Sequence, residues 1–323
     1  MTRFDVFNGD ADGICALQQL RLETPVDSIL VCGPKRDIML LARVPAVHGD
    51  AVTVLDVSLD VNRTALMALL QSGVDVTYFD HHQPGVVPRH DHLHAHIDTS
   101  PETCTSLIVD QYLAGRQRLW AVVGAYGDNL TEVARRAAVQ CGLEDVDARR
   151  LQTLGEAINY NAYGDSADDL FMPPLAVCAS LRPYANPLDF ANSPLARQLD
   201  ELRRRDIACA ERQCPAFVLP GALVYVLPDA RWARRVRGAF SNRLASDAPN
   251  RAHAVLTIAP GDGYTVSVRA PLAEPRGADR LCRAFPGGGG REGAAGINRL
   301  APDRLDAFVA AFSAAFGTDS GDA

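Results

Sequence analysis

Lysine, paired cysteines and long apolar runs are all scarce in this chain of 323 residues. None of its apolar segments approaches the roughly 20 residues that cross a bilayer. The amino terminus also lacks the basic stretch followed by an apolar one that marks a secretory signal. We therefore expect a cytoplasmic protein with no membrane partner.

The sequence also lacks closely spaced pairs of cysteines. The eight cysteines show no CxxC spacing, and Cys15, Cys32 and Cys178 lie among apolar residues. Buried free thiols fit this pattern better than disulfides do. A structural zinc site is not expected, because such a site needs clustered sulfur or imidazole ligands.

Basic residues are fewer than acidic ones, and almost all of them are arginine. The net charge of -7 weighs against nonspecific coating of long nucleic acids. Lys35 is the only lysine of the chain, and it stands with Arg36 shortly after a strand-like run. These two residues are candidates for a phosphate contact, and the alternative is a solvated loop.

The bulk composition, 47% hydrophobic and 22% charged residues, is that of a globular protein. In the first half of the chain, short β-branched runs at 28–31, 52–55 and 76–79 alternate with segments of helical spacing. This alternation predicts an α/β fold with a doubly wound, mostly parallel sheet. Asp60 is the expected N-cap of the helix that follows the run at 52–55.

A smaller mixed α/β domain is expected in the C-terminal third. Strand-like runs lie there at 222–227, 253–258 and 265–269. The last two are separated by Pro260-Gly261-Asp262-Gly263, which is a hairpin signal.

Acidic residues follow several of the predicted strands. Because ligand sites in a parallel sheet gather beyond the carboxyl ends of its strands, these side chains should meet at one edge. Carboxylates brought close together repel one another unless cations neutralise them, so the arrangement predicts bound divalent metal. The acids are Asp10, Asp12, Asp56 and Asp80, with Asp128 at a glycine-marked break further along the chain.

Two common motifs do not explain the first acids. A calcium loop that begins at Asp10 would place Ile14 and Arg21 at positions that need oxygen ligands. The turn also lacks the GxGxxG spacing of a dinucleotide-binding loop. What remains is a strand-to-helix turn whose two aspartates could each address a metal, with Gly13 allowing close backbone approach.

Four segments, in their order along the chain, resemble the motifs of the DHH-family phosphoesterases. They are Asn8-Gly9-Asp10-Ala11-Asp12-Gly13, Asp56 within Leu55-Asp56-Val57-Ser58, Asp80-His81-His82, and Gly127-Asp128-Asn129. A fifth segment, GGGREGAAG at 288–296, resembles the GGGHxxAAG motif of the C-terminal domain often attached to them. The resemblance implies a DHH metal-binding catalytic domain at 1–185, a helical linker at 186–213 and a substrate-binding domain at 214–323, with a cleft between the domains.

The resemblance further implies two Mn²⁺ ions. One ion would be held by Asp10 and Asp56, the second by Asp12, Asp56, His81 and Asp128. His82 would face the substrate phosphate or the leaving group, with Asp80 as a close support. Oxygen ligands with a single imidazole suit manganese better than zinc.

Two positions depart from the family pattern. Many relatives carry His or Asp, a metal ligand, where this chain has Asn8, so the first ion should bind less tightly. Arg291 replaces the motif histidine, and arginine can still grip phosphate in bidentate fashion.

The second domain offers further candidates for substrate contact. Gly288, Gly289 and Gly290, followed by a helix-like stretch at 292–295, are expected to present backbone N–H groups to phosphate rather than to form a flexible loop. Arg269 resembles the family's phosphate-binding arginine, and the alternative is a surface charge at a strand end.

Four alternating histidines, His90, His92, His94 and His96, should share one face of a strand. They form either an additional metal site or an ordinary solvent-facing surface, and His96 lies nearest the acidic edge.

The expected function is therefore manganese-dependent hydrolysis of phosphodiester or phosphomonoester bonds in a small nucleotide, with short single-stranded oligonucleotides processed from an end preferred. Polyphosphate, a 3',5'-bisphosphate nucleotide and a cyclic dinucleotide are alternative substrates. A nucleotide-binding regulatory protein with a weakened metal centre is the alternative from another class. A homodimer is compatible with the sequence.

Overall fold

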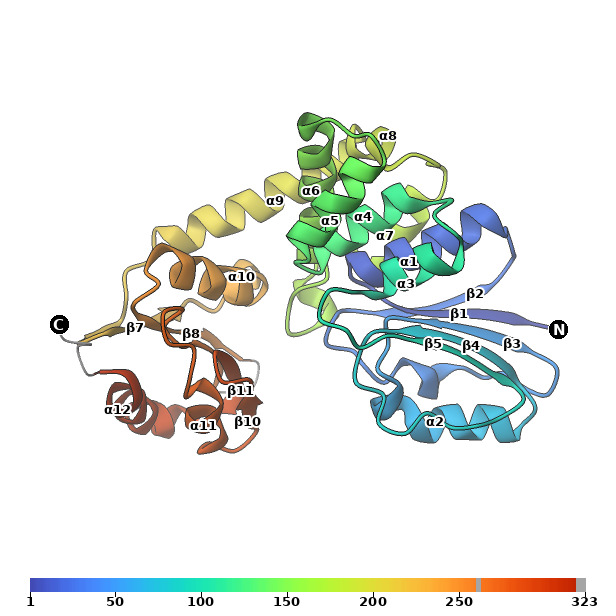
Figure 1. Cartoon of the computed structure of the whole chain (residues 1–323). Coiled ribbons are helices and arrows are strands. Elements are labelled where there is room, and N and C mark those ends of the chain that lie inside the picture. Colours follow the sequence, from blue (N-terminus) through green and yellow to red (C-terminus); the bar gives the residue numbers. More distant parts are fainter. Residues whose placement is uncertain (260–262, 318–323) are drawn as a thin grey trace. The chain divides into compact units, whose positions relative to one another are not determined.

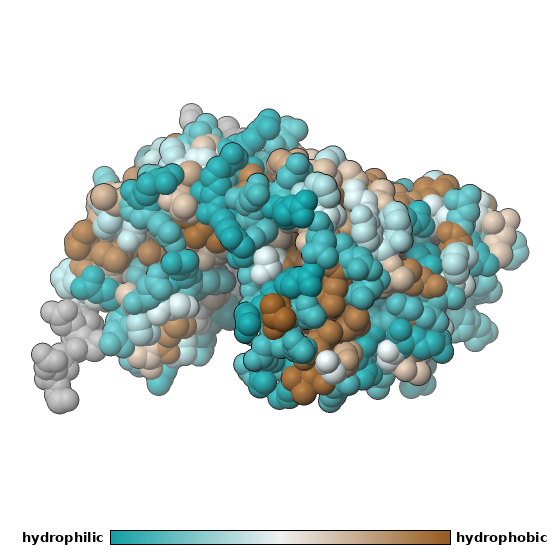
Figure 2. Space-filling model, turned by 90° about the horizontal axis from the view of Figure 1, so that it is seen from above, coloured by the Kyte–Doolittle hydropathy of each residue, from teal (hydrophilic) through white to brown (hydrophobic). Residues whose placement is uncertain are grey.

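The computed structural model describes residues 1–259 and 263–317. The chain divides into two compact units, Met1–Arg203 and Arg204–Ala323. Within the described residues no helix is long and apolar enough to span a membrane. In the view of Figure 2 hydrophilic residues predominate, and apolar residues form separate patches between them.

The first unit is built on a five-stranded, all-parallel sheet with the order β2-β1-β3-β4-β5 (Figure 1). This confirms the predicted doubly wound parallel sheet. The strands are β1 (Arg3–Asn8), β2 (Ile29–Gly33), β3 (Ala51–Leu55), β4 (Asp75–Asp80) and β5 (Leu93–Ile97).

Helices cover both faces of this sheet (Figure 1). On one face α1 (Ala11–Glu23) and α3 (Thr105–Tyr112) share a buried cluster with Phe7. On the other face η1 (Leu40–Arg43) and α2 (Leu59–Gln71) pack over a second buried cluster. Strands buried on both sides read as continuous apolar runs, which is why the runs were visible in the sequence.

The expected N-cap of α2 is wrong by two residues. Ser58 occupies the N-cap position, and Asp60 lies within the first turn. The Asp60 side chain is 62% exposed and pairs instead with Arg63 at 3.1 Å. An acid in the first turn still interacts favourably with the helix dipole.

The rest of the first unit is helical, and small residues bring one of these helices close to α1. A Cβ added at Gly127 would overlap the Ala11 Cβ, and one at Gly124 would overlap the Ser106 hydroxyl. Close helix packing therefore carries the end of α4 to the edge of the sheet. These helices are α4 (Arg118–Gly127), α5 (Thr131–Gln140), α6 (Asp145–Asn161), η2 (Ala167–Asp169), α7 (Pro174–Leu181) and α8 (Pro187–Ala191). The next helix, α9 (Pro194–Glu211), contains the boundary between the two units.

The second unit contains a mixed six-stranded sheet with the order β10-β11-β9-β8-β7-β6, in which only β7 and β8 run parallel. Its apolar faces pack against helices on both sides. This confirms the predicted smaller mixed α/β domain. The strands are β6 (Phe217–Leu219), β7 (Ala222–Leu227), β8 (Ala252–Ile258), β9 (Tyr264–Arg269), β10 (Gly288–Gly290) and β11 (Ala294–Leu300); the helices are α10 (Arg231–Asp247), α11 (Ala278–Arg283), η3 (Pro302–Arg304) and α12 (Leu305–Phe316).

The strands β8 and β9 pair antiparallel, as the hairpin signal predicts. Of the turn itself, Pro260, Gly261 and Asp262 lie outside the described residues.

The helix expected at 292–295 is wrong. The glycine run forms β10, which pairs antiparallel with β11. The Arg291 amide donates to the Ala294 carbonyl at 2.9 Å and closes the turn between them. A Cβ added at Gly288 would overlap the Cys282 carbonyl, and Gly290 has a φ of +142°. Close packing and backbone conformation therefore explain Gly288 and Gly290, whereas a Cβ at Gly289 would meet open space.

Candidate metal centre

The acidic residues converge at the carboxyl edge of the parallel sheet, where the strand order reverses. The chain leaves β1 toward β2 on one side and leaves β3 toward β4 on the other. The loops after the neighbouring strands β1 and β3 therefore diverge, and such a switch point is where doubly wound sheets bind ligands. Asp10 and Asp12 follow β1, and Asp56 follows β3.

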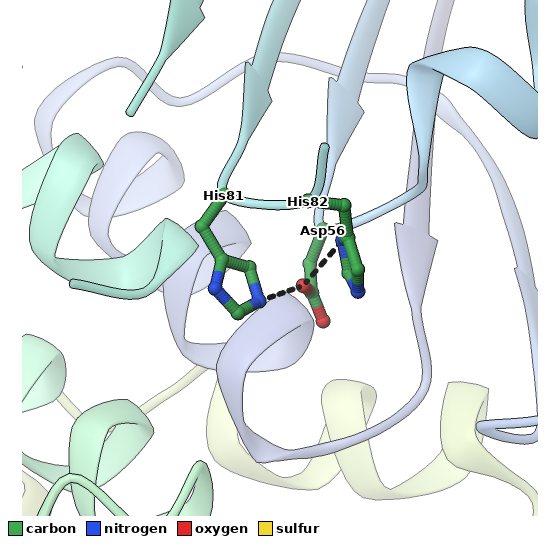
Figure 3. A group of neighbouring side chains, drawn as sticks. All are labelled: Asp56, His81 and His82. Atoms are coloured by element: carbon green, nitrogen blue, oxygen red, sulfur yellow. Dashed lines mark ion pairs between the residues drawn. The ribbon is translucent and has the colours of Figure 1, made fainter. Parts of the chain in front are cut away.

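Two overlapping groups of side chains have ligand atoms within 4.8 Å of one another: Asp56 with His81 and His82, and Asp12 with His81 and Asp128. His81 belongs to both groups. Its Nε2 lies 3.4 Å from Asp56 Oδ1 and 3.8 Å from Asp128 Oδ2. Figure 3 shows the two histidines, from the loop after β4, pointing toward the Asp56 carboxylate between them.

Asp56 reaches the site through an unusual backbone conformation. Its φ of +57° is in the left-handed region, which aspartate tolerates better than most residues. Its amide donates to the Phe79 carbonyl at 3.0 Å, so the turn is tied to β4. Burial, reinforced by the charges of Asp10 and Asp12, raises the pKa of Asp56 well above its usual value. Such strain and charge crowding are typical of functional sites.

The Asp12 carboxylate is fixed by the first turn of α3. The amides of Thr105 and Ser106 each donate to one of its oxygens at 2.7 Å. The Ser106 hydroxyl also donates to the Asp12 carbonyl at 2.8 Å. Sequence reasoning missed both residues, although the polar segment before the apolar run of α3 is a helix-start signal.

Asp80 organises the loop that carries the two histidines. Its carboxylate is buried and accepts the amides of His81 at 2.9 Å, His82 at 3.2 Å and Leu59 at 3.3 Å. It also lies 2.7 Å from the His82 Nδ1, and this hydrogen bond raises the pKa of His82 above its usual value. Asp80 thus fixes the orientation of a half-exposed imidazole.

Asp128 completes the group as the C-cap residue of α4. Burial, with the charge of Asp12 as the next contribution, raises the pKa of Asp128 to about 7. Three crowded carboxylates with one imidazole form an oxygen-rich set that suits Mn²⁺. A divalent ion would offset their mutual repulsion, so Asp12, Asp56, His81 and Asp128 fit a metal site.

The set expected for the first ion looks different. Asp10 caps α1 with one oxygen and accepts the Lys35 ammonium at 2.6 Å with the other. The Asn8 side-chain oxygen accepts the Asp10 amide at 3.3 Å. Among the described residues, Asp10 belongs to neither group of converging ligand atoms. Arg36 pairs with Asp165 at 2.9 Å.

The candidates of the second unit share one end of its sheet. Arg269 stands opposite Ala294 in the register of β9 and β11, next to the turn with the exposed Arg291. Its guanidinium donates to Asn242 at 2.7 Å and to the Ser267 hydroxyl at 3.0 Å. Gly288, Gly289 and Gly290 form the neighbouring edge strand.

The four histidines do not share one strand face. His94 and His96 lie in β5, whereas His90 and His92 precede it. His96 stacks on Phe79, with ring centroids 4.7 Å apart. No group of metal-ligating side chains found in the described part of the chain includes any of the four.

Comparison with known proteins identifies the fold. No family model and no curated protein matches the sequence. Among solved structures, the manganese-bound exonuclease RecJ is similar, with a TM-score of 0.63, 19% identity and coverage of 97% of this chain and 89% of that one. The chain has the DHH-family fold.

Two further structures with this DHH-family fold differ in length. RecJ from Thermus thermophilus with Mn²⁺ has a TM-score of 0.60 and 18% identity, and the match covers 97% of this chain but 51% of RecJ. The pGpG-specific phosphodiesterase PggH from Vibrio cholerae has a TM-score of 0.59 and 15% identity, with 97% of both chains covered.

Proposed function

We propose that this protein is a Mn²⁺-dependent phosphoesterase that hydrolyses small nucleotide substrates, with short oligonucleotides attacked from an end preferred. The observation that carries this proposal is the convergence of Asp12, Asp56, His81 and Asp128 at the switch point of the sheet.

These four residues would hold the metal. A bound divalent ion supplies Lewis-acid stabilisation of phosphoryl oxygens and lowers the pKa of bound water. His82 is the proposed general acid. Asp80 binds its Nδ1 and favours the imidazolium, so Nε2 remains available to give a proton to the leaving oxygen.

Three observations support a small nucleotide attacked from an end as the substrate. PggH, named as specific for pGpG, matches this chain over 97% of both lengths. RecJ is named as an exonuclease, which supports attack from an end rather than a particular substrate length. The net charge of -7 weighs against long polyanions. We propose Lys35, Arg36, Arg269, Arg291 and, through their backbone, Gly288, Gly289 and Gly290 as substrate contacts.

The test is a Mn²⁺-supported hydrolysis panel. It compares a linear dinucleotide, a pentanucleotide, kilobase single-stranded DNA, a 3',5'-bisphosphate nucleotide, a cyclic dinucleotide and polyphosphate. We expect the dinucleotide and pentanucleotide to be cleaved fastest. Asp56→Asn should lower kcat by at least about 100-fold, which is the scale expected for loss of metal-centred charge stabilisation.

Asp91→Asn, which changes an exposed aspartate, is the matched control and should keep full activity. Faster cleavage of kilobase DNA would contradict the substrate assignment. Tight nucleotide binding without hydrolysis of any substrate would instead favour a regulatory binding protein.

A further inference from the structure

Lys35 points into the acidic cluster rather than into solvent. Its ammonium lies 2.6 Å from Asp10 Oδ2 and 3.9 Å from Asp128 Oδ1. Its amide donates to the Ala162 carbonyl at 3.2 Å, and its ammonium lies 5.9 Å from the centroid of the Tyr163 ring. Backbone and side chain are therefore both anchored, at the only lysine of the chain.

The residues expected to hold the first metal ion are less suited to bind it. Asn8 supplies a neutral amide, and its oxygen already accepts the Asp10 amide. One Asp10 oxygen accepts the amides of Asp12 and Gly13 at 3.1 and 3.2 Å, and the other accepts Lys35. A divalent ion on Asp10 would have to displace the ammonium or lie beside it, and like charges so close repel strongly.

From this geometry we propose that the Lys35 ammonium takes the place of one of the two metal ions, so that the centre binds a single divalent ion beside a fixed lysine cation. The inference rests on the proposed metal centre and specifies its composition.

A fixed ammonium can replace part of the charge stabilisation that a metal ion provides. Lysine carries three donors on a flexible stem, and Asp10 uses one of them. The remaining donors can bind a phosphoryl oxygen and stabilise its developing charge. The Asp10 and Asp128 carboxylates, 2.6 and 3.9 Å from the ammonium, stabilise its charged form. Lys35 would then be both a counter-ion and a substrate contact.

The test counts Mn²⁺ ions per chain by electron paramagnetic resonance of free Mn²⁺ during titration. The variants are Lys35→Met, which keeps the stem without the charge, and Asn8→Asp combined with Lys35→Met. Arg43→Met, which removes an exposed cation paired with Asp37, is the matched control. Thermal melting of each variant reports whether it folds.

We expect one tight ion per chain in the wild type and in Arg43→Met, and two ions in the double variant. Two ions of similar affinity in the wild type would overturn the inference but leave the proposed function intact. One ion in the folded double variant would overturn it as well, because Lys35 would not be what excludes the second ion. No bound Mn²⁺ in the wild type would refute the proposed function itself. If the double variant does not fold, the wild-type count decides.

Discussion

Asp128 is predicted to destabilise the metal-free fold, so that Asp128→Asn should make the metal-free protein more stable. Burial and the charge of Asp12 raise the pKa of Asp128 from 3.8 to about 7. Its side chain is 21% exposed, so solvent screens it only in part. At neutral pH, folding therefore holds a carboxylate in a place that favours the neutral acid.

The size of the effect follows from the two pKa values. Below pH 3.8 the carboxyl is protonated in both states and contributes nothing. Between pH 3.8 and about 7 the unfolded chain releases the proton and the folded chain keeps it, so stability falls as the pH rises. Above pH 7 the loss is complete and amounts to about 4 kcal/mol, because each pKa unit is worth 1.36 kcal/mol. This is an upper bound, because asparagine also loses the attraction of Lys35.

The assay is thermal unfolding at pH 7.5 with chelator and again with saturating Mn²⁺. With chelator, Asp128→Asn should melt above wild type, by no more than about 8–16 °C, since 1 kcal/mol shifts Tm by about 2–4 °C in a unit of this size. With Mn²⁺ the order should reverse, because the variant loses a metal ligand and with it the stabilisation by binding. Asp91→Asn should change neither Tm. A metal-free variant that melts at or below wild type would refute the reasoning.

Three further perturbations test the framework of the site. Thr105→Pro removes one amide that binds the Asp12 carboxylate, at a helix position that accepts proline, and Mn²⁺ affinity by calorimetry should fall at least about 10-fold. Thr105→Val keeps the amide and loses only the hydroxyl that donates to Asp56 at 3.4 Å, so it should lower the affinity less. In metal-free protein, Asp80→Asn should lower the pKa of His82, and an unchanged imidazole titration by NMR would contradict the pairing. Gly124→Ala places a methyl group against a hydroxyl of α3 and should cost about 1–3 kcal/mol in chemical denaturation, whereas Gly238→Ala, which meets open space, should not destabilise.

The parallel strands were predictable because their sequences carry their own signal. Buried strands of a doubly wound sheet need apolar, β-branched side chains on both faces, and the runs at 28–31, 52–55 and 76–79 supply them. The acids that end these strands follow the same logic. Sequence could therefore place Asp56 and Asp80 at one edge of a sheet.

The glycine-rich segment at 288–296 was not predictable by the same reasoning. Glycine has no side chain to show a helical or strand period, and Ala294 and Ala295 favour a helix by intrinsic propensity. The structure makes the second half of the segment a strand because it pairs with β9. Long-range pairing overrides local preference in such a segment.

The two hydrogen bonds from Thr105 and Ser106 to the Asp12 carboxylate were not predictable for a different reason. They are made by backbone amides more than 90 residues away in sequence. Every residue except proline carries such an amide, so the contact cannot be predicted from residue types.

The sequence by itself determined which carboxylates stand at strand ends, which histidines follow them, and that a single lysine accompanies them. Tertiary structure decided how these parts combine. The strand order placed β1 beside β3 and so brought Asp12 and Asp56 together, close packing of α4 on α1 added Asp128, and the loop after β2 laid Lys35 on Asp10. Residue types and local spacing fix the chemistry that is available, whereas only long-range packing fixes which charges become neighbours.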